Sequence, residues 1–176
     1  MIKIGIIGDI GSGKSFIAKQ FGFQVFSADK EVTKIYKNNK NCFLSLKNQF
    51  PKHISSFPIK KNELMEAILE NQTNIKKINK IVHPLVRNLM NKFLYKNRNK
   101  KFVILDIPLL LESKLNKKKC ILIFVSAKKK EIIKRLSKRP NYNKKIFDKL
   151  RKLQLPLEFK EKKSNFIIKN NFKIIS

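Results

Sequence analysis

The octapeptide GDIGSGKS, residues 8–15, constrains the fold more than any other part of the chain. It satisfies the pattern G-x-x-x-x-G-K-[ST] through Gly8, Gly13, Lys14 and Ser15, and it directly follows the apolar run MIKIGII. Between a strand and a helix, such a loop points its backbone N–H groups and the helix N-terminus at phosphate oxygens. The sequence therefore predicts a nucleoside triphosphate site, with Lys14 on the β- and γ-phosphates and Ser15 on Mg²⁺.

The whole segment from the end of the apolar run is predicted to surround the nucleotide. Its residues are Gly8, Asp9, Ile10, Gly11, Ser12, Gly13, Lys14, Ser15 and Phe16. The alternative is a glycine-rich turn that merely joins a strand to a helix, but the full match to the pattern makes this alternative the weaker one.

Five short runs rich in β-branched and aromatic residues predict strands. They span residues 2–7, 23–26, 102–105, 121–125 and 166–168 and alternate with helical segments. This alternation predicts an α/β fold with a mostly parallel sheet, in which ligands bind beyond the carboxyl ends of the strands.

About seventy residues separate the second and third predicted strands, far more than an ordinary crossover requires. Apolar residues recur there at helical spacing, and Pro84 suits the first turn of a helix. We therefore expect two domains: residues 1–30 and 101–176 as a nucleotide-binding core, and residues 31–100 as a helical insertion that holds the acceptor. The basic stretch at about residues 135–155 is predicted to be a lid, with a solvated charged helix and loop as the alternative.

The formal net charge of +29 raises the possibility of nucleic-acid binding. Only five of the 41 basic residues are arginine, and the lysines are spread along almost the whole chain, which disfavours a dedicated nucleic-acid surface. Because arginine is scarce, each arginine is a candidate for a position that requires a planar, bidentate cation. The arginines are Arg87, Arg98, Arg135, Arg139 and Arg151.

The length of the apolar runs and the spacing of the cysteines bear on membrane proteins, disulfide-bonded proteins and zinc proteins. No apolar run approaches the roughly 20 residues of a membrane span, so we expect a soluble, cytoplasmic protein without membrane partners. Cys42 and Cys120 are far apart in the sequence and lack the spacing of a zinc site. The sequence therefore predicts neither a disulfide nor a cysteine-bound metal.

Two aspartates follow predicted strands and are candidates for chemistry. Asp106 ends the run FVILD, where a carboxylate beside a phosphate loop holds Mg²⁺, and Asp29 ends VFSAD, where it could accept a proton from an attacking hydroxyl. Either could instead cap a helix. His83 could be a core histidine, or it could face a phosphate or ribose together with Arg87 one helical turn later.

Several segments, in the order in which they occur along the chain, resemble motifs of the dephospho-CoA kinase family, the P-loop enzymes that catalyse the last step of coenzyme A biosynthesis. They are GDIGSGKS, SAD, IVHPLVR, DIPLLLES, QLPLEFK and NFIIKNN, which span most of the chain. The resemblance implies a P-loop NTPase-like three-layer sandwich with a five-stranded, mostly parallel sheet, a helical insertion and a lid. It also implies transfer of the γ-phosphate of ATP to the 3′-hydroxyl of the dephospho-CoA ribose, giving CoA and ADP.

The resemblance further implies roles for individual residues. Lys14, Asp29, Asp106 and Arg139 are the predicted catalytic residues, with Asp29 as general base and Arg139 on the transferred phosphoryl group. Arg135 and Asn170 join the loop as nucleotide contacts, and Ser15 and Asp106 are the predicted Mg²⁺ ligands. The predicted acceptor contacts are Asp29, His83, Arg87, Pro108, Leu109, Leu110 and Glu112.

The chain departs from the family pattern at a few positions. Asp9 stands where a glycine is common and brings a negative charge to the triphosphate, and Leu150 stands where an arginine often precedes the glutamine, with Arg151 one place along. Two other functions remain possible on sequence grounds. One is a nucleoside or nucleotide kinase of the same fold, and the other is a nucleic-acid-binding P-loop module.

Overall fold

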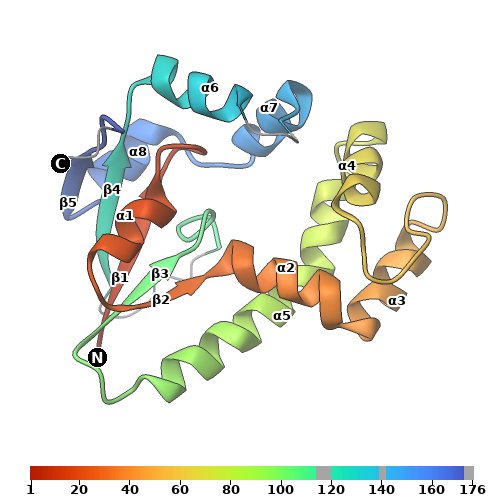
Figure 1. Ribbon diagram of the computed structural model, residues 1–176, viewed down its shortest axis with the longest axis horizontal. Coiled ribbons are helices and arrows are strands. Elements are labelled where there is room, and N and C mark those ends of the chain that lie inside the picture. The colour runs from red at the N-terminus through yellow and green to blue at the C-terminus, as the bar shows by residue number, and fades with distance from the viewer. Residues whose placement is uncertain (114–119, 139–141, 173–176) are drawn as a thin grey trace. The chain divides into compact units, whose positions relative to one another are not determined.

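The computed structural model describes residues 1–113, 120–138 and 142–172 and contains a five-stranded parallel sheet (Figure 1). The strands are β1 (Ile2–Gly8), β2 (Gln24–Ser27), β3 (Phe102–Asp106), β4 (Cys120–Ser126) and β5 (Phe166–Lys169). Their order is β2-β3-β1-β4-β5, and each neighbouring pair is parallel. The predicted α/β fold with a five-stranded, mostly parallel sheet is therefore confirmed.

The centre of the sheet is buried because its strands are almost continuously apolar, as is typical of parallel sheets covered on both faces. Helix α1 (Lys14–Gln20) packs on one face through Ala18, which is fully buried. The core cluster on this face comprises Ile4, Ile6, Ala18, Ile104, Ile123 and Val125. The packing of α1 against β1 and β3 fixes the direction in which the loop between β1 and α1 leaves the sheet.

Three further helices belong to the same compact unit as the sheet, which comprises residues 1–27 and 96–176. They are α6 (Lys129–Ser137), α7 (Lys144–Lys152) and α8 (Leu157–Lys162). Asn143 caps the N-terminus of α7, because its side chain accepts a hydrogen bond from the N–H of Ile146. Helix α8 packs against β1.

Residues 28–95 form a second compact unit made of helices. Its helices are α2 (Ala28–Asn38), α3 (Lys40–Gln49), α4 (Lys61–Glu70) and most of α5 (Asn74–Lys96). Side chains at the helix starts stabilise them: Asn39 accepts from the N–H of Cys42, and Glu63 accepts from the N–H of Lys60. No helix in the described ranges is long and apolar enough to cross a membrane.

The prediction that Pro84 begins a helix is wrong. Helix α5 runs without interruption from Asn74 to Lys96 and contains Pro84 in its interior. Proline removes one backbone hydrogen bond there, but a buried apolar stripe formed by Ile75, Ile78, Val82, Val86 and Met90 continues on both sides of it. Tertiary burial of this stripe outweighs the local preference of proline for a helix start.

Candidate nucleotide-binding site

The loop between β1 and α1 has the backbone of a phosphate-binding loop. Gly8, Gly11 and Gly13 all have positive φ angles, of 144°, 84° and 92°. A Cβ atom on Gly13 would collide with the side-chain amide of Asn170. The loop therefore depends on glycine both for its backbone conformation and for the close approach of its neighbours.

Lys14 lies across this loop with its ammonium group inside it. Its Nζ donates to the carbonyl oxygens of Asp9 at 2.7 Å and Gly8 at 3.3 Å, and the residue is only 8% exposed. These carbonyls hold the charge at the centre of the loop before any ligand arrives. A buried, pre-positioned ammonium group can stabilise charge on polyphosphate oxygens.

Two side chains with oxygen atoms suited to Mg²⁺ lie at the start of α1 and at the carboxyl end of β3. Ser15 is exposed at the start of α1, and Asp106 ends β3 in register with Ile6 of β1. Asp106 is buried, and its Oδ2 accepts a long hydrogen bond of 3.5 Å from the hydroxyl of Ser27 at the end of β2. A hydroxyl, a carboxylate and phosphate oxygens form the hard donor set that Mg²⁺ prefers.

Other features of the loop also fit an anionic ligand. The hydroxyl of Ser12 is buried and has no hydrogen-bond partner within the part of the chain that the structure describes. Among the residues that the structure describes, no three or more His, Cys, Asp or Glu side chains form a cluster that could hold a metal ion without other ligands. A divalent cation here would depend on oxygens brought by the nucleotide, as is common for Mg²⁺.

A pocket of about 740 Å³ lies beside the loop and is lined by α6 and the chain after β5. Arg135 stacks on the ring of Phe172, with its Cζ 4.4 Å from the ring centroid. Asn170 donates from Nδ2 to the carbonyl of Ser12 at 2.9 Å and accepts from the N–H of Phe172. Asn170 thus joins the phosphate loop to a pocket that offers a guanidinium and an aromatic ring to a flat ligand.

The predicted acceptor residues after β3 divide into partly buried and fully buried positions. Pro108 and Leu109 retain partial exposure, whereas Leu110 is completely buried next to Gly5. The side chain of Leu110 therefore packs in the core of this unit.

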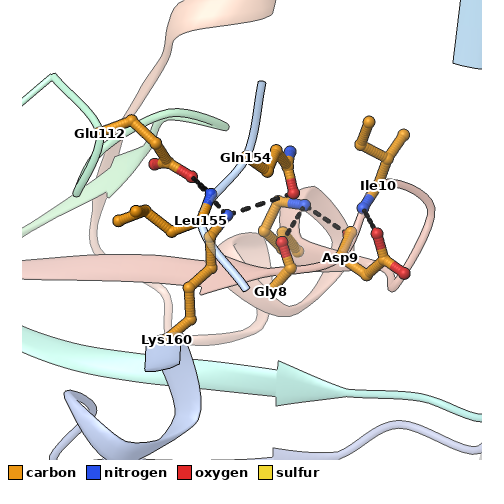
Figure 2. A network of polar contacts seen from close by, with 8 residues as sticks. Gly8, Asp9, Ile10, Glu112, Gln154, Leu155 and Lys160 are labelled. Atoms are coloured by element: carbon orange, nitrogen blue, oxygen red, sulfur yellow. Dashed lines mark hydrogen bonds and ion pairs between the residues drawn. The ribbon is translucent and has the colours of Figure 1, made fainter. Parts of the chain in front are cut away.

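Glu112 takes part in a buried polar network (Figure 2). Its Oε1 lies 2.8 Å from Nζ of Lys160 and accepts from the N–H of Leu155 at 2.9 Å, while Lys160 also donates to Gln154 at 3.2 Å. Lys160 is 1% exposed. The network ties the loop after β3 to the segment between α7 and α8, a function that sequence reasoning did not assign to Lys160.

The helical unit carries the other predicted acceptor residues. Asp29 is exposed in the first turn of α2, immediately after β2, and its backbone carbonyl accepts from Thr33. His83 and Arg87 line an open pocket of about 460 Å³ along α5, together with Lys76, Lys80 and Pro84. Partial desolvation of the ring and the charge of Arg87 lower the pKa of His83, so the positive charge of this surface at neutral pH comes from its lysines and Arg87.

Asp9 forms an ion pair that the sequence did not predict. The residue is 5% exposed, its Oδ1 accepts from the N–H of Ile10, and its Oδ2 lies 3.1 Å from Nη2 of Arg151. The scarcity of arginine had singled out Arg151, but nothing in the sequence linked it to Asp9. Arg139, predicted to act on the transferred phosphoryl group, lies outside the described residues.

A parallel sheet with a glycine-rich loop after its central strand, a buried lysine at that loop and an aspartate at the end of the adjacent strand defines a P-loop nucleotide-binding protein. Comparison with known families makes the assignment specific. Residues 2–175 match the family model described as "Dephospho-CoA kinase". The chain belongs to the dephospho-CoA kinase family, a family of ATP-dependent kinases.

Individual relatives agree with this assignment. The dephospho-CoA kinase of Wolbachia sp. subsp. Brugia malayi is 36% identical over 170 residues, which cover 94% of this chain and 87% of the relative. The crystal structure of TT1252 from Thermus thermophilus matches with a TM-score of 0.78 and 27% identity, covering 97% of this chain and 88% of that one. Dephospho-CoA kinase from Campylobacter jejuni matches with a TM-score of 0.64 and 26% identity, covering 96% and 88%.

Proposed function

We propose that the protein transfers the γ-phosphate of ATP to the 3′-hydroxyl of the dephospho-CoA ribose, with Mg²⁺ as cofactor, giving CoA and ADP. The observation that carries the proposal is the buried ammonium group of Lys14 inside a phosphate loop, in a chain that matches the dephospho-CoA kinase family along almost its entire length. Bound Mg²⁺ would neutralise charge on the phosphate oxygens, and Ser15 and Asp106 would hold it.

The chain's own residues then divide the work of phosphoryl transfer. Lys14 exchanges its loop carbonyls for the β- and γ-phosphate oxygens, and Arg139 offsets charge on the transferred group. Arg135 and Asn170 receive the nucleotide base in the pocket beside the loop. This base position is supported by the guanidinium, amide and aromatic groups that line the pocket.

Each of the two compact units carries residues that we propose as acceptor contacts. Arg87 and His83 would contact the ribose or phosphates of the acceptor, a proposal supported by the basic lining of the pocket on α5. In the unit that contains the sheet, Pro108 and Leu109 would contact the acceptor. Leu110 and Glu112 would hold the loop after β3 in place, because Leu110 is fully buried and Glu112 is paired with Lys160.

The test is ADP release by the purified protein with ATP and Mg²⁺, with and without dephospho-CoA. We expect ADP formation that depends on dephospho-CoA, with CoA as the identified product. A panel of nucleosides and nucleotides serves as the comparison. Turnover with one of these acceptors and silence with dephospho-CoA would replace the proposal by a nucleoside or nucleotide kinase.

Asp29 is the proposed general base, and its replacement has a defined kinetic signature. Asp29→Asn is expected to lower kcat by roughly 10²–10⁴-fold, because general-base catalysis contributes about that much, while the KM for ATP changes little. Glu31→Gln is the matched control, since it removes a carboxylate from the same turn of α2. A change confined to ATP affinity in Asp29→Asn would contradict the assignment of Asp29 as base.

A further inference from the structure

The phosphate loop contains an acid whose carboxylate is almost entirely removed from solvent. Asp9 is 5% exposed, and each of its carboxylate oxygens has a partner: the N–H of Ile10 at 2.8 Å and the guanidinium of Arg151 at 3.1 Å. Arg151 comes from the last turn of α7, far from the loop in the sequence, and its side chain is 36% exposed. The loop therefore has its negative charge neutralised by a separate helix.

A carboxylate in this place works against the binding of a polyanion. The carbonyl of Asp9 accepts a hydrogen bond from Lys14, so the acid lies within the same loop that must surround the triphosphate. Like charges a few Å apart at a protein surface repel by enough to weaken binding by about tenfold or more. A buried charge that loses its partner is also strongly unfavourable.

We propose that Arg151 is a positioning residue for nucleotide binding, which neutralises Asp9 and holds its carboxylate away from the incoming phosphates. The inference rests on the proposed function only in taking the phosphate loop as the ATP site. The ion pair makes a loop that carries an acid compatible with a triphosphate, and it fastens α7 to that loop. Arg151 acts through Asp9 and needs no contact of its own with the nucleotide.

The test is the dissociation constant of a non-hydrolysable ATP analogue with Mg²⁺, measured by titration calorimetry without any acceptor. Arg151→Leu is expected to weaken binding by about tenfold or more, because Asp9 then faces the phosphates without its cation. The double variant Asp9→Asn with Arg151→Leu is expected to bind within about threefold of the unmodified protein, because the repulsion is gone. Asn also keeps an oxygen that can accept from the N–H of Ile10.

Lys152→Leu is the matched control, because Lys152 is an exposed cation on the same helix, next to Arg151. It should leave the dissociation constant within about twofold of the original value, which excludes a general effect of net charge. Thermal unfolding of each variant identifies any loss of binding that follows from loss of the fold.

Two results would overturn the proposal. Unchanged binding in Arg151→Leu would show that Asp9 needs no neutralisation, and a double variant that binds as weakly as Arg151→Leu would show that Arg151 contacts the nucleotide itself. Since no acceptor is present, these results are independent of whether dephospho-CoA is the substrate. Normal binding and rescue together with no phosphorylation of dephospho-CoA would reject the proposed function alone.

Discussion

The Lys14→Ala variant is expected to lose at least about 10²–10³-fold in kcat, since that is the usual cost of removing one pre-positioned charge stabiliser from a transferring group. The physical reason is the position of the ammonium group, which two loop carbonyls already hold at the centre of the phosphate loop. Binding of ATP would then require little rearrangement of this side chain. The measurement is steady-state turnover with dephospho-CoA as acceptor.

Lys19→Ala is the matched control for this variant. Lys19 lies on the same helix, α1, but it is exposed at the opposite end from the loop. Its removal should change kcat by less than about twofold, because surface charges contribute little. Full activity in Lys14→Ala would remove the phosphate loop from the mechanism.

The Lys160→Met variant is expected to lose about 3–5 kcal/mol of unfolding free energy, which is the typical cost of removing one partner of a buried ion pair. Lys160 is 1% exposed and lies 2.8 Å from Glu112, whose side chain is itself only 13% exposed. Without the ammonium group, the carboxylate would remain buried with only the N–H of Leu155 as its partner in the network described above. Urea unfolding followed by circular dichroism measures the loss.

Two companion variants identify the origin of that loss. Lys162→Met, at an exposed position of the same helix, is expected to change the unfolding free energy by less than about 0.5 kcal/mol. Adding Glu112→Gln to Lys160→Met should recover part of the loss, because a neutral amide is less costly to bury and can still accept from Leu155. A Lys160→Met protein as stable as the original would mean that the pair contributes nothing to stability.

Local patterns in the sequence were sufficient for the sheet and for the centre of the site. Runs of β-branched and aromatic residues located all five strands to within about two residues, because these residues favour the extended backbone. In the central strands β1, β3 and β4 the apolar run is nearly continuous, as burial on both faces requires. The phosphate loop was also predicted from the sequence, because its backbone conformation requires glycine at fixed positions. Pro84 was misread as a helix start, because the local preference of proline does not report the apolar stripe that carries α5 through it.

The sequence by itself determined the class of protein, the phosphate loop, the positions of the strands along the chain and the family to which the chain belongs. Each of these depends on residues close together in the chain or on motifs in a fixed order. Only the tertiary structure decided which charges meet. Asp9 pairs with Arg151, and Glu112 pairs with Lys160, across long stretches of sequence. The physical reason is that an ion pair depends on distance in space, and among 41 basic residues no local pattern distinguishes the one lysine or arginine that folding brings to a buried carboxylate.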